Sequence, residues 1–204
     1  PFRCGRADLA LLLIDFQRDF LDVGGFGHSL GNDVGKLARA VAPARALLAA
    51  ARAARIPVVH TLEAHLPDLS DCPPAKLARC ASIGATLSES RGRMLVRGEP
   101  GNAIIPQLEP AAGESVVHKP GKGAFYSTDL DATLKGLGVS HLLVAGVTTE
   151  VCVQTTLREA NDRGYNCLLV ADASASYFDA LHDATIEMVV AQGGIVGWAA
   201  QSAD

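Results

Sequence analysis

Residues 141–171 read HLLVAGVTTEVCVQTTLREANDRGYNCLLVA, and this stretch decides the fold. Residues 141–146 form a short apolar run that predicts a strand, residues 149–163 predict a helix, and residues 166–171 predict a second strand. Gly164 stands where a glycine is expected after the end of a helix. A strand, a helix and a strand in this order are typical of a right-handed crossover between parallel strands.

The same alternation continues on both sides of this unit. Further strands are predicted at residues 8–14, 57–62, 115–119 and 195–198, and further helices at residues 36–55, 128–136 and 179–192. We therefore expect one α/β domain over residues 1–204, doubly wound, with a mostly parallel sheet between helices in a Rossmann-like three-layer sandwich. Residues 63–113 are proline-rich and weakly periodic, which is typical of a functional excursion such as a lid or a subunit interface.

Composition excludes several classes of protein. Hydrophobic residues make up 49% of the 204 residues and the net charge is -4, which disfavours a disordered chain and a nucleic-acid binder. The apolar runs are shorter than the ~20 residues that span a bilayer. The five cysteines have irregular spacing without a CxxC pair, which disfavours both a disulfide framework and a structural zinc site. We expect a cytoplasmic protein without a membrane or nucleic-acid partner.

Reactive side chains follow three of the predicted strands. Asp15 comes directly after the first strand, Lys119 ends the strand at residues 115–119, and Cys152 lies shortly after the strand at residues 141–146. In open parallel sheets, ligands bind beyond the carboxyl ends of the strands. The topology therefore predicts a carboxylate, an amine and a thiol at one edge of the sheet.

Cys152 has a second feature of interest. If Thr149 caps its helix, Cys152 is the third helical residue, where free N–H groups and the helix dipole favour a thiolate. With Lys119 as a nearby cation and Asp15 as a proton acceptor, the set contains the parts that covalent acyl transfer needs. A buried cysteine is also often a small packing residue, so these positions alone leave both interpretations open.

Three segments resemble the isochorismatase-like cysteine hydrolases: LLLIDFQRDF (11–20), KPGKGAFYSTDL (119–130) and AGVTTEVCVQTTLREANDRGY (145–165). The resemblance covers nearly the whole chain and implies a catalytic triad of Asp15, Lys119 and Cys152. It also implies a cis peptide between Val147 and Thr148, which would turn the N–H of Thr148 toward an oxyanion hole shared with the N–H of Cys152. No cofactor is implied.

Within this family, HTLEAHLPDLSDCPPAK (60–76) and AQGGIVGW (191–198) are most similar to biuret hydrolases. Family members that act on nicotinamide hold a metal with an Asp and two His, and Glu63 and His65 are the nearest counterparts here. Because their surrounding stretch resembles the metal-free type, we expect no catalytic metal. Leu62 replaces an arginine that is usual in that stretch, so the substrate loop is expected to differ.

Four more residues are predicted to contact the substrate. Phe20 would form an apolar wall and Lys122 lies in the glycine-rich turn after Lys119. Gln192 resembles a glutamine that biuret hydrolases use on the substrate, and its amide both donates and accepts hydrogen bonds. Tyr126 is a weaker choice. The alternative roles are core packing for Phe20, a solvated turn for Lys122, a helix C-terminus for Gln192 and a structural role for Tyr126.

The expected function is hydrolysis of a C–N bond in a small carbamoyl or ureido compound through a Cys152 thioester, with biuret giving allophanate and ammonia as the first choice. Ureidoacrylate, N-carbamoylsarcosine and triuret are alternatives within the same mechanism. A non-catalytic binding protein or a thiol sensor is the alternative from another class. The family assembles as dimers and tetramers, so we expect a homodimer or a homotetramer.

Overall fold

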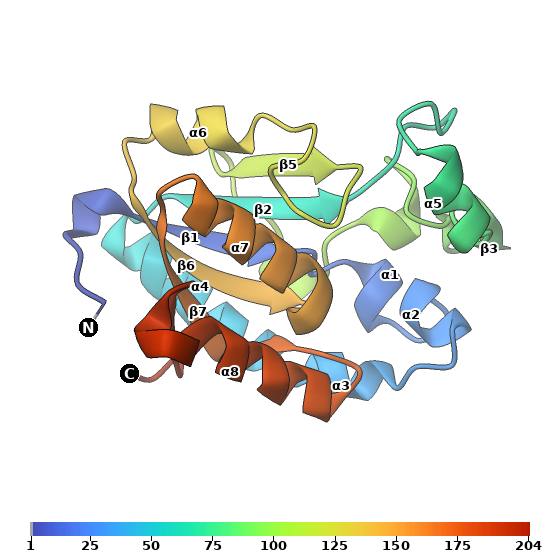
Figure 1. The fold of residues 1–204 in the computed structure, drawn as a ribbon. Coiled ribbons are helices and arrows are strands. Elements are labelled where there is room, and N and C mark those ends of the chain that lie inside the picture. Colours follow the sequence, from blue (N-terminus) through green and yellow to red (C-terminus); the bar gives the residue numbers. More distant parts are fainter. Residues whose placement is uncertain (1) are drawn as a thin grey trace.

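Six parallel strands form the centre of the computed structural model, which describes residues 2–204 (Figure 1). Their order across the sheet is β5-β2-β1-β6-β7-β8, and every neighbouring pair is parallel. The strands are β1 (Leu9–Ile14), β2 (Val58–Glu63), β5 (Ser115–Lys119), β6 (His141–Val147), β7 (Asn166–Ala175) and β8 (Trp198–Ala200). The predicted parallel sheet is thereby confirmed.

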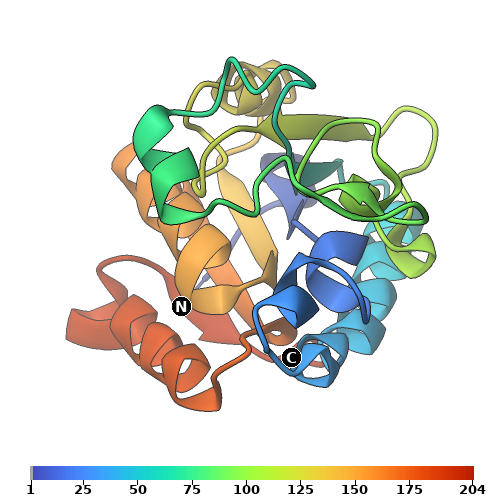
Figure 2. The same cartoon turned by 90° about the vertical axis from the view of Figure 1, so that its right-hand side faces the viewer.

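Strand β1 explains why the sheet is covered on both faces. All six of its residues are buried, and alternate side chains enter different hydrophobic cores. Leu11 and Leu13 pack toward α3 (Val34–Ala38) and α4 (Val41–Ala54). Ala10, Leu12 and Ile14 pack in the core of the opposite face. That face is covered by α6 (Leu130–Gly136), α7 (Gln154–Asp162) and α8 (Asp179–Gly194). Figure 2 shows the sheet between these two helical layers, as a doubly wound domain requires.

Several element boundaries differ from those predicted. The single helix expected over residues 36–55 is two helices, α3 and α4, and Pro43 lies in the first turn of α4, where its missing N–H has no helical partner to lose. The helix expected at residues 149–163 begins with a π-helical segment, η4 (Thr149–Val153), which α7 continues. The last strand, β8, starts at Trp198 rather than at residue 195.

Residues 63–113 lie largely at the edge where the strands end (Figures 1 and 2). They contain α5 (Pro74–Arg79) and an antiparallel pair, β3 (Thr86–Ser88) with β4 (Gly92–Arg93). Two short helices, α1 (Arg18–Leu21) and α2 (Phe26–Ser29), lie at the same edge. The remaining short turns are η1 (Arg6–Asp8), η2 (Pro100–Asn102) and η3 (Pro106–Leu108). Whether 63–113 acts as a lid or a subunit interface stays a prediction, as does assembly into a homodimer or homotetramer.

Among the helices of residues 2–204, none combines the length and the apolar character needed to cross a membrane.

Candidate active site

Asp15 and Lys119 meet at the carboxyl edge of the sheet. Asp15 follows β1 directly and Lys119 is the last residue of β5, on the far side of β2. Their side chains are fully buried, and Lys119 Nζ lies 2.7 Å from Asp15 Oδ2. The structure thus brings together two of the three residues that the sequence placed at this edge.

Further contacts hold both groups in place. Thr61 Oγ1 donates to Asp15 Oδ1 at 2.6 Å, which leaves Oδ2 as the oxygen paired with Lys119. The Lys119 ammonium also donates to the backbone carbonyls of Gly121, at 3.0 Å, and Lys122, at 2.9 Å. The glycine-rich turn that follows β5 therefore serves to orient the lysine at its start.

Cys152 is the third member of the predicted triad. It is 4% exposed and lies in η4, with its sulfur within 4.8 Å of carboxylate oxygens from both Asp15 and Glu63. The expected capping by Thr149 is wrong, because Thr148 holds the N-cap position of η4, without a side-chain capping bond, and the Thr149 hydroxyl forms a hydrogen bond with His182 Nδ1 at 2.8 Å. The peptide between Val147 and Thr148 is cis, as the resemblance implied.

The surroundings set the protonation state of the Cys152 thiol. Burial raises its pKa well above the ordinary value. The ammonium groups of Lys119 and Lys122 act to lower it, while the carboxylates of Asp15 and Glu63 raise it further. The lowering expected from Lys119 is therefore outweighed by desolvation and the two carboxylates. The resting sulfur is a thiol that needs a proton acceptor.

Glu63 is the main site residue that sequence reasoning did not assign. It ends β2 as the register partner of Lys119, and its carboxylate is fully buried. Lys76 Nζ lies 2.7 Å from Oε1, Lys122 Nζ lies 2.8 and 3.0 Å from the two oxygens, and Cys152 Sγ donates to Oε2 at 3.7 Å. A carboxylate at the end of a buried strand, beside the strand that ends in Lys119, was the signal available in the sequence.

The lysines determine the charge of Glu63. Burial alone would raise its pKa, but Lys119, Lys122 and Lys76 together lower it to about 2. Glu63 is consequently an anion throughout the physiological range. Burial alone would lower the pKa of Lys119, but the attraction of the Asp15 and Glu63 carboxylates outweighs it and raises this pKa.

This cluster bears on the question of a metal. The ligand atoms of Asp15, Glu63 and Cys152 lie within 4.8 Å of one another, close enough to share a cation. However, Lys119 already contacts Asp15, while Lys76 and Lys122 pair with Glu63. Three ammonium groups therefore already pair with the two carboxylates, which opposes the entry of a divalent cation. The donor set fits a metal poorly, and the absence of a catalytic metal stays a prediction.

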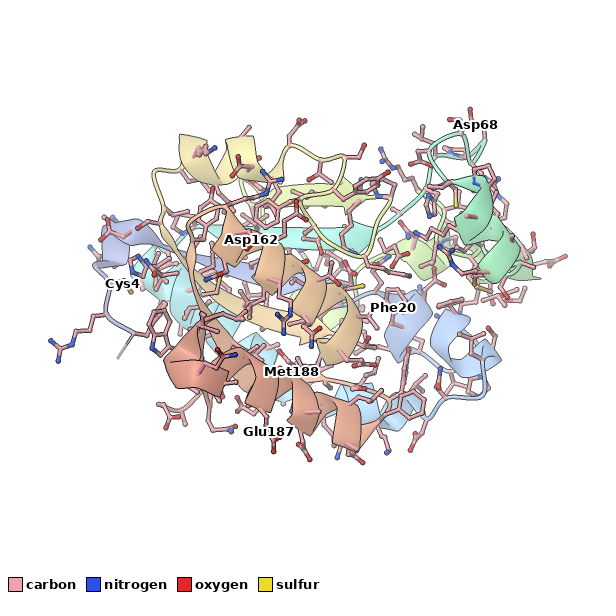
Figure 3. All side chains as sticks on the ribbon, in the orientation of Figure 1. Cys4, Phe20, Asp68, Asp162, Glu187 and Met188 are labelled. Carbon is pink, nitrogen blue, oxygen red and sulfur yellow. The ribbon has the colours of Figure 1, made fainter. Side chains whose placement is uncertain are left out.

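A cavity of about 180 Å³ opens onto the Cys152 sulfur. Phe20 and Lys122 line it, as the sequence predicted, and Figure 3 places Phe20 at the edge where the strands end. Tyr126 does not line it: its side chain is 55% exposed and lies over Gly121. Gln192 is exposed near the end of α8, at the opposite edge of the sheet, because α8 runs antiparallel to the strands.

The other cavity-lining residues come from α2, from the end of β2, from η4 and from loops, and only Glu63 and Thr148 among them had been named from the sequence. They are Phe26, Leu30, Asn32, Glu63, Thr148, Glu150, Val151 and Tyr177. The Tyr177 hydroxyl donates to the backbone carbonyl of Phe20 at 2.8 Å and so ties the segment after β7 to α1. The site is therefore small, largely apolar on one side and charged on the other.

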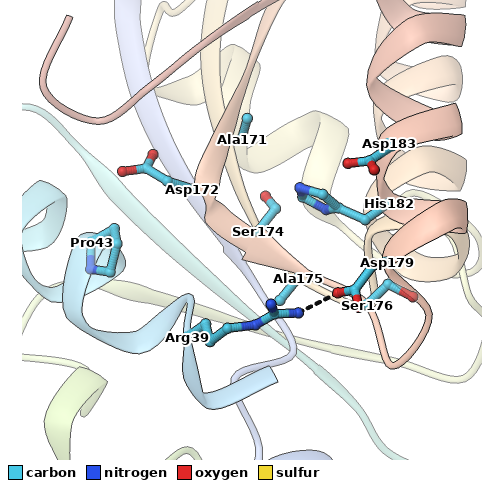
Figure 4. A pocket seen from close by; sticks show the side chains of 10 residues that line it. All are labelled: Arg39, Pro43, Ala171, Asp172, Ser174, Ala175, Ser176, Asp179, His182 and Asp183. Carbon is cyan, nitrogen blue, oxygen red and sulfur yellow. Dashed lines mark hydrogen bonds and ion pairs between the residues drawn. The ribbon is translucent and has the colours of Figure 1, made fainter. Parts of the chain in front are cut away.

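A larger cavity of about 430 Å³ lies elsewhere, between α3, α4, the end of β7 and the start of α8 (Figure 4). Arg39 pairs there with Asp179 across the opening. His182, which bonds to Thr149, is part of its wall. None of Asp15, Lys119 and Cys152 lines this cavity.

Comparison with known proteins places this site in a family. The ureidoacrylate amidohydrolase RutB of Methylobacterium radiotolerans is 31% identical over 85% of this chain and 69% of its own length. A crystal structure of an isochorismatase family protein from Desulfovibrio vulgaris has a TM-score of 0.81 at 30% identity, covering 96% of this chain and 95% of that one. A cysteine hydrolase from Pseudomonas syringae pv. phaseolicola has a TM-score of 0.84 at 25% identity, covering 100% and 92%. Residues 9–201 match the sequence model described as the Isochorismatase domain, and the chain therefore belongs to the isochorismatase family.

Proposed function

We propose that this protein is a cysteine-dependent amidohydrolase that cleaves a C–N bond of a small carbamoyl or ureido compound. The observation that carries the proposal is the buried Cys152 thiol at the wall of a small cavity, within 4.8 Å of carboxylate oxygens from Asp15 and Glu63. A nucleophile, a proton acceptor and fixed cations are the parts that acyl transfer through a thioester requires.

Asp15 is the proposed base. Its Oδ1 is occupied by the Thr61 hydroxyl, so the proton of the thiol would pass to Oδ2. The sulfur then forms a bond to the carbonyl carbon, the C–N bond breaks, and the proton held on Asp15 leaves with the amine as ammonia. Water, deprotonated by the same carboxylate, hydrolyses the thioester and restores the thiol.

The lysines supply the electrostatic part of the mechanism. With Cys152 as a thiol, Lys76, Lys119 and Lys122 exceed by one the charges of the two carboxylates that they pair with, Asp15 and Glu63. A thiolate or an oxyanion in the reacting complex neutralises this surplus, so the cluster favours the transition state over the resting state. The backbone N–H groups of Thr148 and Cys152 are the proposed donors to the oxyanion.

The preferred substrate is biuret, and ureidoacrylate is the second candidate. The small volume of the cavity suits a substrate of few non-hydrogen atoms. Biuret is supported by the stretch at residues 60–76 and by carboxylates in the cavity wall, which suit a neutral compound rich in N–H groups. Ureidoacrylate is favoured by the curated relative at 31% identity that carries that name.

The test is ammonia release from biuret, triuret, ureidoacrylate, N-carbamoylsarcosine and nicotinamide, measured with the wild-type protein and with Cys152→Ala. We expect release from at least one ureido compound and none above background from the variant, whose thermal unfolding should stay close to that of wild type. Mass spectrometry of rapidly quenched reactions should detect an acyl adduct on Cys152. Equal turnover by Cys152→Ala would refute the mechanism, and no release from any compound would favour a binding or thiol-sensing role.

A further inference from the structure

Glu150 has an unusual position in the cavity wall. It lies two residues before Cys152 in η4 and lines the same cavity. Its Oε2 atom is shielded from solvent and has no hydrogen-bond partner among residues 2–204. Within that part of the chain, Glu150 forms no ion pair, in contrast to Asp15 with Lys119 and Asp71 with Arg97.

Two polar side chains in the same cavity wall direct their donors to groups other than Glu150. The Tyr177 hydroxyl is directed to the backbone carbonyl of Phe20. The Lys122 ammonium is engaged by both oxygens of Glu63. A buried acceptor without a donor costs free energy, and such groups call for an explanation when they line a site. A donor carried by the substrate would provide one.

The chemistry of the donor follows from the carboxylate. An ionised carboxylate only accepts hydrogen bonds, so the group that binds it must carry N–H or O–H. A urea-type compound with its carbonyl carbon at the Cys152 sulfur has N–H groups on both sides of that carbon. A substrate with its own carboxylate would instead bring a like charge to Glu150, which forms no ion pair among residues 2–204, whereas Glu63 in the same wall is paired with Lys76 and Lys122.

We propose that Glu150 is a specificity-determining residue, which accepts hydrogen bonds from the N–H groups of a neutral urea-type substrate and disfavours anionic ureido acids. This inference rests on the proposed function and deepens it, because it selects the substrate class of the biuret type over that of the ureidoacrylate type. The competing explanation is structural: an acidic side chain in the first turn of a helical segment stabilises that segment without contacting substrate.

The test compares Glu150→Gln with wild type on two substrates, biuret and ureidoacrylate. Glutamine keeps the size of the side chain and removes its charge. We expect kcat/KM for biuret to fall about tenfold to a hundredfold, as the loss of a hydrogen bond to a charged group predicts, mainly through KM. For ureidoacrylate, kcat/KM should stay the same or rise. Glu187→Gln is the matched control, since Glu187 is exposed on α8 (Figure 3) and its variant should leave both values unchanged.

A binding measurement separates this inference from the proposed function. Biuret should protect the Cys152 thiol of the wild-type protein against iodoacetamide, and Glu150→Gln should need about tenfold more biuret for the same protection. Equal losses on the two substrates, or unchanged protection by biuret, would overturn the role of Glu150 while the amidohydrolase function stands. If the wild-type protein neither turns over nor binds biuret, both proposals fail.

Discussion

Replacing Glu63 by glutamine tests how the buried charges of the site are balanced. The pKa of this carboxyl is lowered from 4.5 to about 2, because Lys119, Lys122 and Lys76 outweigh the effect of burial. A pKa difference of about 2.5 between the folded and unfolded states corresponds to roughly 3 kcal/mol by which the folded state favours the ionised carboxylate. Without the Glu63 carboxylate, Lys76 and Lys122 lose the anion that they pair with, and both ammonium groups then lie near Lys119 unpaired. We therefore expect Glu63→Gln to lower the free energy of unfolding at pH 7 by roughly 3 kcal/mol, or the melting temperature by about 6–12 °C.

The same substitution should affect the thiol in the opposite sense. Glu63 raises the pKa of Cys152, and Lys119 and Lys122 lower it, so removing the carboxylate should shift this pKa down. Iodoacetamide reacts with the thiolate, and its reaction with Cys152 should therefore be faster at pH 7 in the variant. The variant is thus expected to be less stable and more reactive at the same time.

The contribution of Glu63 to the free energy of unfolding depends on pH in a defined direction. Because the pKa of Glu63 is lower in the folded state, its contribution is complete above pH 4.5 and is lost as the pH falls toward 2. Urea unfolding between pH 7 and pH 3 should show the difference between wild type and Glu63→Gln shrinking as the pH falls. The alkylation of Cys152 is followed by mass spectrometry over pH 6–10.

Glu114 offers a matched control at the other end of β5. Burial alone would raise its pKa, but Arg52, the backbone N–H of Ala111 and His60 lower it to about 2. Glu114→Gln should therefore destabilise the fold and leave the pH profile of Cys152 alkylation unchanged. The reasoning is refuted if Glu63→Gln leaves stability unchanged, or if it moves the alkylation profile to higher pH.

Two further predictions concern stability near the site. Burial raises the pKa of Asp19 from 3.8 to about 6, so its contribution to the stability of the fold is present below pH 3.8 and is lost as the pH rises through 6. In urea unfolding between pH 4 and pH 7, the free energy of unfolding of Asp19→Asn should therefore gain up to about 3 kcal/mol relative to wild type. Parallel pH curves for the two proteins would contradict this. A Cβ at Gly146, where φ is 152°, would lie 2.6 Å from Ile14 Cβ and collide with the Ile14 carbonyl oxygen. Gly146→Ala should cost about 3 kcal/mol, while Gly136→Ala, which meets nothing within 4 Å, should be neutral or stabilising; equal melting temperatures for the two variants would exclude the clash.

The sequence by itself determined the fold and the edge that holds the site. The apolar run of β1 can be buried only between two layers, and residues 141–171 form a β6–α7–β7 crossover, so a doubly wound parallel sheet followed. Because parallel strands all end at one edge, Asp15, Lys119 and Cys152 were predicted to meet without any knowledge of distances. These predictions depend on chain direction and local periodicity, which a sequence contains.

Only the tertiary structure decided the electrostatics and the composition of the cavity wall. The pKa of Cys152 is raised rather than lowered, since burial and the approach of Glu63 depend on contacts between residues far apart in the chain. Gln192 lies at the opposite edge because the direction of α8 sets its place, whereas Glu150 lines the cavity through the path of η4. Burial and through-space charge depend on the packing of all elements at once, and no local pattern of residues contains that information.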